Sequence, residues 1–242
     1  MDERLLVIER WKKKVEGIRF DPPIDYKLTF SNTLTNMADM KYSLLDIGTG
    51  AGRVIFENGL DKIYRKIVGI DIRPEMIQIC KERAKGMKNV EFHVMDSTKQ
   101  MDFKPGSFDV ISAMFPPFNP HEVHRLLSPG GYFVLLSSLK GDHKEVVKLF
   151  PEVERETSGG YYNTVKGLNT ALRGVGFKIM ASSILRYKWI FKDEEILKEF
   201  YEKISFAPVF EGREEKLAEL KRSINGSIMV TRLLCTTVAK KV

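Results

Sequence analysis

From Ser43 onward, the chain alternates short apolar runs with segments whose apolar residues recur every three or four positions. The short runs are typical of buried strands, and the wider spacing is typical of helices packed on a sheet. Helices between successive strands allow those strands to run parallel. The pattern predicts an α/β fold with a doubly wound, mostly parallel, seven-stranded sheet, whose sixth and seventh strands cover residues 179–186 and 227–238.

Two helical patterns precede the predicted sheet. The first rests on four apolar positions before Gly17: Leu5, Ile8, Trp11 and Val15. The second is expected over residues 26–40, after Pro22 and Pro23 break the chain. We expect residues 1–40 to form an N-terminal helical cap that lies on the domain.

The segment between the last two predicted strands is unusually long and aromatic. Among the aromatic residues of 187–226 are Trp189, Phe191, Phe200, Phe206 and Phe210. This insertion is interpreted in two ways, as additional core on the edge of the sheet or as an aromatic lid over a pocket. We predict one domain over residues 1–242, with a core at 41–186, the insertion at 187–226 and the last strand at 227–242.

Composition bounds the class of protein. The 242 residues are 43% hydrophobic and 29% charged, as in ordinary globular domains. Asp2, Glu3 and Arg4 open the chain, the apolar run after them is too short for a secretory signal, and no segment is long enough to span a membrane. We therefore expect a cytoplasmic protein that does not insert into membranes.

Cysteines, histidines and charge narrow the chemistry further. The two cysteines, Cys80 and Cys235, and the four histidines are too scattered for a metal site, so we predict no metal and no disulfide. The formal net charge is +7, but the basic residues are spread along the chain. The positive net charge is compatible with a nucleic-acid partner, but the scattered basic residues do not indicate one.

A glycine-rich loop carries the strongest functional signal. Residues 44–52 read LLDIGTGAG, and a second apolar run ends in Asp71, nineteen positions after Gly52. Glycines let a backbone approach a ligand closely, and an acid at the tip of the next strand accepts hydrogen bonds from a ribose diol. The pair predicts a nucleoside cofactor. The G-x-G-x-G register, with Asp46 where a pyrophosphate would be repelled, argues against NAD or FAD.

Later segments extend this pattern in a consistent order. They are VEFHVMDS at 90–97, FDVISAM at 108–114, LLSPGGYFVLL at 126–136 and LRGVGF at 172–177. With the glycine loop and Asp71, these segments resemble the class I S-adenosylmethionine-dependent methyltransferases. The resemblance covers about residues 40 to 186 and the last strand, and it implies the Rossmann-like fold of that family.

The resemblance also implies roles for individual residues toward S-adenosylmethionine. Gly48, Thr49 and Gly50 would lie under its methionine and ribose, with Asp46 near its amino group. The remaining implied contacts are Asp71 with the ribose hydroxyls, Ile72 with the adenine face, Asp96 and Ser97 with the adenine edge, and the backbone of Ala113 with the methionine. For Asp96 an alternative is a turn acid that caps its own backbone.

The segment Met114–Phe118 is similar to the Asn-Pro-Pro-Phe signature of methyltransferases that act on amino nitrogens. Phe115 stands where that signature has its amide or carboxylate, and a phenyl ring cannot accept a hydrogen bond from an amino group. Pro116 and Pro117 are interpreted as a rigid exit from a strand, with the phenyl rings able to stack on a flat acceptor. His121 and His124 follow, either as a general base or as ordinary surface histidines.

The sequence is identified as a member of a methyltransferase family that transfers a methyl group from S-adenosylmethionine to an unidentified acceptor. A small molecule is favoured because the added mass is aromatic and no basic RNA-binding module is visible. A tRNA or rRNA methyltransferase is the first alternative, and a cofactor-binding protein without transfer activity is the second. The catalytic residues, the acceptor and the oligomeric state are left open.

Overall fold

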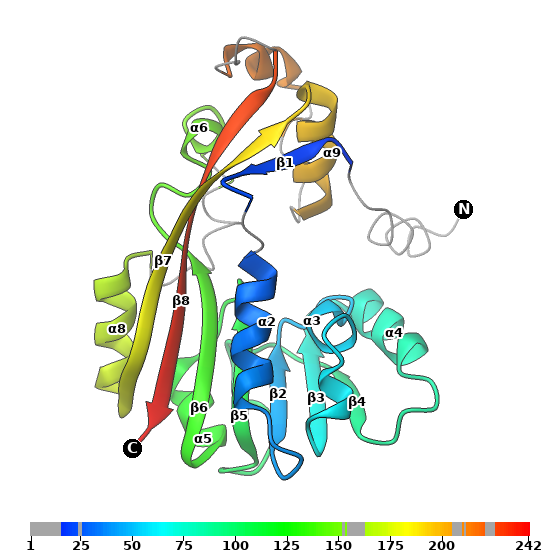
Figure 1. Ribbon diagram of the computed structural model, residues 1–242, viewed down its shortest axis with the longest axis vertical. Helices are drawn as coiled ribbons and strands as arrows, with labels where there is room; N and C mark the ends of the chain where they lie inside the picture. Colours follow the sequence, from blue (N-terminus) through cyan, green and yellow to red (C-terminus); the bar gives the residue numbers. More distant parts are fainter. Residues whose placement is uncertain are drawn as a thin grey trace.

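The computed structural model describes residues 16–23, 26–151, 153, 163–204, 210, 212–220 and 226–242, in one mixed sheet flanked by helices (Figure 1). The four apolar positions of the first predicted helix, and Phe206 of the insertion, lie outside these residues. The strands are β1 (Ile18–Asp21), β2 (Ser43–Ile47), β3 (Lys66–Asp71), β4 (Val90–Val94), β5 (Phe108–Met114), β6 (Leu127–Ser138), β7 (Phe177–Phe191) and β8 (Ile228–Lys241).

Helices connect most of these strands. They are α2 (Tyr26–Met37), α3 (Arg53–Phe56), α4 (Pro74–Arg83), α5 (Pro120–Leu126), α6 (Lys144–Val147), α8 (Val165–Gly174) and α9 (Glu194–Ile204), with short 3₁₀ helices η1 (Leu60–Lys62) and η2 (Glu214–Glu219). The predicted helix over 26–40 is therefore confirmed as α2. Pro74 opens α4, where its missing N–H group costs no helical hydrogen bond.

The strand order is β1-β7-β8-β6-β5-β2-β3-β4. The five strands β4, β3, β2, β5 and β6 pair in parallel, whereas β8 runs antiparallel between β6 and β7. The α/β fold with a doubly wound sheet is confirmed. The predicted number of seven strands was wrong, because the sheet has eight strands among the described residues. The extra strand, β1, is short and mostly exposed, so it carries no apolar pattern.

The long strands β7 and β8 also correct a predicted boundary. Strand β7 continues to Phe191, beyond the predicted end at residue 186, and β8 continues to Lys241. Residues 187–191 alternate between buried and half-buried because they still pair with β8, so the insertion begins only after Phe191. Figure 1 shows this hairpin extending past the end of β6, with β1, α6 and α9 around the extension.

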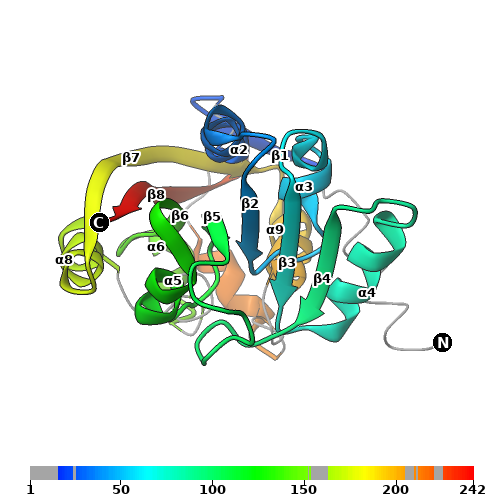
Figure 2. The same cartoon turned by 90° about the horizontal axis from the view of Figure 1, so that it is seen from below.

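Alternation along the strands divides the buried residues into two clusters, one on each face of the sheet. Leu44, Val110 and Leu136 belong to the cluster that includes α2, while Leu45 and Ile111 belong to the cluster under α5 and α8. Seen from below, α2 and α3 lie on the opposite side of the sheet from α5 and α8 (Figure 2). Both faces are therefore covered, as a parallel sheet requires.

The parallel strands place their carboxyl ends together at one edge. The chain winds from β2 outward to β4 and then returns to β5, which pairs with β2. Ligands in open α/β sheets bind outside such a reversal of strand order. We therefore expect the ligand site at the loops that follow Ile47 and Met114.

Candidate functional site: a glycine loop beside an aromatic and charged face

The glycine loop after β2 adopts a backbone that other residues disfavour. Gly48, Gly50 and Gly52 have φ angles of 67°, 53° and 73°, all in the left-handed region. A Cβ at Gly48 would lie 2.6 Å from Cβ of Pro116, and one at Gly52 would lie 2.5 Å from the ring of Phe56. Both glycines are needed because neighbouring side chains occupy the space.

Gly50 differs from the other two glycines. A Cβ at Gly50 would meet no atom of the described residues within 4 Å. Its carbonyl oxygen instead accepts a hydrogen bond from Cys80 of α4 at 3.1 Å, and Arg83 donates to the carbonyl of Ala51 at 2.7 Å. Helix α4 thus fixes the loop from behind and leaves the side at Gly50 open to a ligand.

Asp71 lies directly against this loop. Its Oδ2 accepts a hydrogen bond from the backbone N–H of Gly50 at 2.9 Å, and its Oδ1 accepts from the backbone N–H and Nε of Arg73 at 3.0 and 3.2 Å. The loop and the acid that the sequence pairs by spacing are therefore in direct contact. Among the described residues, Oδ2 accepts only one hydrogen bond and has a second lone pair, so Asp71 can still accept a hydrogen bond from a ribose hydroxyl.

Asp46 is buried at the crevice with an unsatisfied oxygen. Its Oδ1 accepts a hydrogen bond from the hydroxyl of Ser112 on β5 at 2.7 Å, while Oδ2 has no partner among the described residues. Burial raises the pKa of Asp46 to about 6, against the opposing effect of the Ser112 hydrogen bond. A buried carboxylate that lacks a partner is stabilised by a nearby cation, so this position fits the ammonium group of an amino acid.

The residues predicted to contact adenine differ in their surroundings. Ile72 is 57% exposed just beyond β3 and offers an open apolar surface. Asp96 caps its own turn, because its Oδ1 accepts from the backbone N–H and hydroxyl of Thr98 at 2.9 and 2.6 Å. Ser97 donates its hydroxyl to the carbonyl of Pro117 at 2.7 Å, which ties the two loops at the carboxyl ends together. The roles of Asp96 and Ser97 toward adenine stay predictions.

The end of β5 brings a residue to the site that the sequence did not favour. Ala113 is buried inside the strand, in register with Ile47 and Leu135. The first residue beyond β5 is Phe115, whose φ of 70° is uncommon for a bulky residue. Backbone strain of this kind concentrates at functional sites. Phe115 points its ring toward Tyr26, with centroids 6.1 Å apart.

A buried ion pair on the hairpin extension was missed entirely. Arg232 of β8 donates from Nε and Nη2 to the two oxygens of Asp142 at 2.9 and 3.1 Å. The neighbouring His143 hydrogen-bonds Tyr201 of α9, and burial lowers the pKa of His143 to about 3. The sequence did hold a signal, since a charged residue interrupts the apolar run of the last strand.

The two histidines after β5 have different surroundings. His121 lines a hollow of about 490 Å³ formed with Thr98, Asn119 and the end of α8. The His124 ring packs edge-on against Phe177 at 5.1 Å, and burial lowers its pKa. His124 is therefore a packing residue at the edge of α5, whereas His121 is accessible from the hollow.

Other predictions can be compared with the described residues. Cys80 and Cys235 are both buried free thiols. The part of the chain that the structure describes contains no group of three or more metal-ligating His, Cys, Asp or Glu side chains. Within the same residues, each helix is too short or too polar to cross a bilayer.

Comparison with known sequences places the chain in a family. Residues 38–199 match the family model described as a methyltransferase domain. A putative protein N5-glutamine methyltransferase from Methanocaldococcus jannaschii is 29% identical over 178 residues, which are 61% of this chain and 86% of that protein. A demethylmenaquinone methyltransferase from Staphylococcus haemolyticus is 25% identical over 159 residues, 59% of each. The chain spans only 4% of a highly reducing polyketide synthase from Gibberella moniliformis, to which it is 34% identical over 108 residues.

Solved structures agree on the fold. The YcgJ protein of Bacillus subtilis superposes with a TM-score of 0.65 at 16% identity, covering 88% of this chain and 98% of that one. At such low identity the likeness shows a shared fold alone. The family match over two thirds of the chain shows that it belongs to the class I S-adenosylmethionine-dependent methyltransferases.

Proposed function

We propose that this protein binds S-adenosylmethionine on the glycine loop and transfers its methyl group to a small-molecule acceptor. The observation that carries the proposal is the unsatisfied Oδ2 of buried Asp46, which lies in the strand that leads into the open loop at Gly50. Asp71 hydrogen-bonds the same loop. These three features fit, in order, a cationic amino group, a closely approached backbone and a ribose diol.

Bound S-adenosylmethionine supplies a methyl group that its sulfonium already activates. The protein's own residues therefore act by binding and orientation, which can supply much of a methyl-transfer rate. Asp46 holds the amino group through a charge-assisted contact, and Asp71 accepts hydrogen bonds from the ribose. Ile72 shields one face of the adenine. Phe115 and Pro116 form the wall between this cofactor site and the acceptor.

Two observations support a small-molecule acceptor. Aromatic side chains of α2 and β7 lie next to Phe115, which suits a compact, partly apolar compound. The relative from S. haemolyticus is named for a menaquinone precursor. An RNA acceptor stays the alternative, and it would make acceptor binding fall steeply as salt concentration rises.

A second candidate is transfer to the side-chain amide of a protein. It is favoured by the relative named as a protein N5-glutamine methyltransferase and by the Pro116-Pro117 pair after β5. Phe115 weighs against it, because its ring offers no acceptor for an amide N–H group. A Phe115→Asn variant that gained transfer to a glutamine peptide would favour this candidate.

The test is calorimetric titration of the full chain with S-adenosylmethionine, S-adenosylhomocysteine and NADH. We expect the first two to bind and NADH not to bind. Asp71→Asn weakens binding of both because the amide loses a charged acceptor, whereas Asp39→Asn, in an exposed turn before β2, leaves it unchanged. Binding of NADH alone, or equal binding by both variants and the wild type, would refute the proposal.

A further inference from the structure

The hairpin extension carries three buried polar residues on one face. Tyr187 of β7 pairs directly with Arg232 of β8, and Trp189 lies two positions further along β7. Residues two apart on a strand, and direct cross-strand partners, point to the same side of a sheet. Tyr187, Trp189 and Arg232 are 2%, 3% and 3% exposed. We call these three residues the hairpin face.

Several polar atoms on this face have no partner among the described residues. The hydroxyl of Tyr187 and the indole Nε1 of Trp189 are buried, and neither makes a hydrogen bond of ordinary geometry with the described residues. Burial raises the pKa of Tyr187, and an interaction with the Trp189 indole opposes that rise. The hydroxyl of Ser138 is equally unsatisfied, and its register with Leu234 places it on the same side of the sheet. Buried polar groups without partners are rare in native proteins, so these atoms on one face are candidates for contact with a ligand.

Arg232 has hydrogen-bonding capacity left over. Asp142 engages its Nε and Nη2, and Nη1 has no hydrogen bond with any residue that the structure describes. The guanidinium stacks 3.8 Å from the ring centre of Trp189 and lies 5.8 and 5.9 Å from those of Tyr26 and Phe115. A delocalised cation on an aromatic face is held flat, with its edge available to a planar partner.

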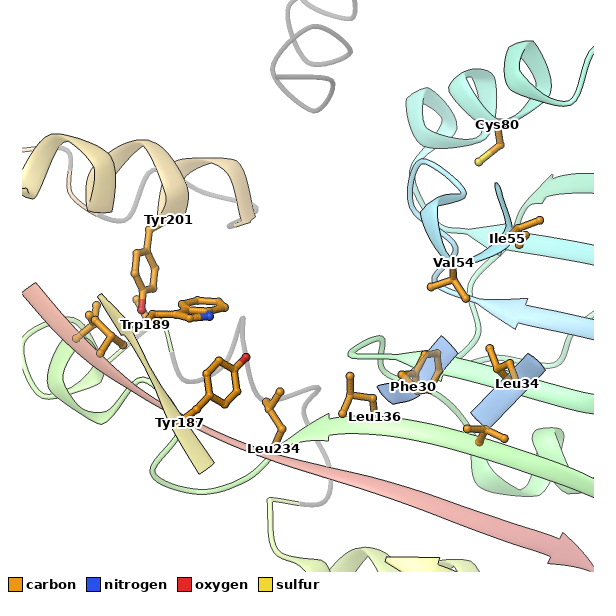
Figure 3. Packing of buried hydrophobic residues seen from close by; sticks show 14 of the residues in the cluster. Phe30, Leu34, Val54, Ile55, Cys80, Leu136, Tyr187, Trp189, Tyr201 and Leu234 are labelled. Carbon is orange, nitrogen blue, oxygen red and sulfur yellow. The ribbon is translucent and has the colours of Figure 1, made fainter. Parts of the chain in front are cut away.

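Aromatic rings border the same space. Tyr26, the first residue of α2, stacks on Tyr187 with ring centres 6.1 Å apart and an interplanar angle of 27°. The ring of Phe115 closes the other side against Tyr26. In Figure 3 the hydroxyl of Tyr187 and the nitrogen of Trp189 both point toward the side of the view where Phe30 and Val54 lie.

The hairpin face lies next to the cofactor loop. Phe115 lies close to Arg232, and the following residue, Pro116, has its ring against Gly48. A ligand on the hairpin face and a cofactor on the glycine loop are therefore separated by the short segment Phe115-Pro116. This arrangement is what a transfer between two bound molecules requires.

We propose that the hairpin face, with Ser138, binds the methyl acceptor, and that this acceptor is a planar aromatic compound bearing an anionic oxygen. Trp189 and Arg232 can only donate hydrogen bonds, so their partner must be an acceptor atom. The guanidinium favours an anion over an ammonium group, and the rings favour a flat molecule. The assignment rests on the proposed function, whose acceptor class it specifies.

The experiment uses three probes with the full chain, with and without saturating S-adenosylhomocysteine. The probes are 4-hydroxybenzoate, its neutral methyl ester, and cyclohexanecarboxylate, an anion that is not planar. Calorimetry should give 4-hydroxybenzoate an affinity about tenfold or more above its ester, the difference expected for one charge-assisted hydrogen bond. Cyclohexanecarboxylate keeps the charge but should also bind more weakly than 4-hydroxybenzoate, because it has no flat ring to stack. Equal affinity for the ester, or no binding of 4-hydroxybenzoate, would overturn the proposal.

Matched variants locate the binding. Tyr187→Phe and Ser138→Ala each remove one unsatisfied hydroxyl and should each weaken 4-hydroxybenzoate binding about fivefold or more. The control is Ser137→Ala, which removes an equally unsatisfied hydroxyl from the opposite face of β6 and should leave binding unchanged. Equal weakening by all three variants would contradict the assignment to this face.

The two proposals can fail separately. If S-adenosylhomocysteine fails to bind but 4-hydroxybenzoate still binds and depends on Tyr187, the cofactor assignment is wrong and the hairpin face is a ligand site. If S-adenosylhomocysteine binds while 4-hydroxybenzoate does not, the methyltransferase proposal stands and the acceptor class is wrong.

Discussion

Replacing Asp46 with asparagine tests the electrostatics of the cofactor site without a ligand. Burial raises the pKa of Asp46 from 3.8 to about 6, so ionisation costs more in the folded protein than in the unfolded chain. This carboxyl therefore contributes full stability below pH 3.8 and loses it as pH rises through about 6. The difference corresponds to about 3 kcal/mol in the free energy of unfolding at pH 8.

An asparagine side chain keeps the shape of the aspartate but does not ionise. The free energy of unfolding of Asp46→Asn, relative to wild type, should therefore rise by about 2 to 3 kcal/mol between pH 4 and pH 8. Urea unfolding at half-unit steps of pH measures this difference. The gain comes with weaker binding of S-adenosylmethionine, because the amide cannot neutralise an ammonium group. A variant that is more stable but binds S-adenosylmethionine more weakly would indicate that the charge of Asp46 serves binding rather than stability.

The control is Ser112→Ala, which removes the hydrogen bond that lowers the pKa of Asp46. The Ser112→Ala variant should be less stable than wild type at every pH. Its free energy of unfolding should also keep falling to a higher pH, because the pKa of Asp46 is higher without this hydrogen bond. If the stability curves of wild type and Asp46→Asn run parallel across this range, the carboxylate is not destabilised by burial and the argument fails.

Three further changes test the framework of the site, each by urea unfolding. Gly48→Ala places a methyl group 2.6 Å from the rigid ring of Pro116. It should lower the free energy of unfolding by about 1 to 3 kcal/mol and weaken cofactor binding. An unchanged urea midpoint would contradict the close approach of Pro116 to Gly48. Leu34→Ala leaves a cavity at a fully buried position of α2 and should cost about 2 to 5 kcal/mol. Asp142→Ala leaves the buried guanidinium of Arg232 unpaired and should cost about 3 to 5 kcal/mol, whereas a loss below about 1 kcal/mol would mean that water reaches it.

The parallel half of the fold could be predicted from the sequence because its signals are local. The glycine loop and Asp71 are separated by one helix and one strand, and their contact follows from the geometry of that unit. The hairpin extension could not be predicted in this way. Tyr187, Asp142 and Arg232 come from distant segments, and only the antiparallel insertion of β8 brings them together.

Dependence on contacts between distant segments also explains where the sequence predictions of strands were wrong. Strand β1 has too few buried residues to leave a pattern, and its pairing with Trp189 and Ile190 depends on tertiary packing. The end of β7 was placed too early because aromatic residues are common in both strands and insertions. Pro116 and Pro117 were interpreted as a rigid strand exit and the ring of Phe115 as able to stack on an acceptor; the left-handed backbone of Phe115 is visible only in the structure.

The position of β8 has a consequence for how the chain folds. Strand β8 is the last strand in the sequence, yet it lies between β6 and β7. It pairs with β7 along nearly its whole length and with residues 132–138 of β6. During synthesis, β6 and β7 must wait with unpaired edges until residues 228–241 are available. Exposed strand edges invite pairing with other chains, and such long-range closure is slow. We expect chains that stop before β8 to aggregate rather than to form a smaller active enzyme.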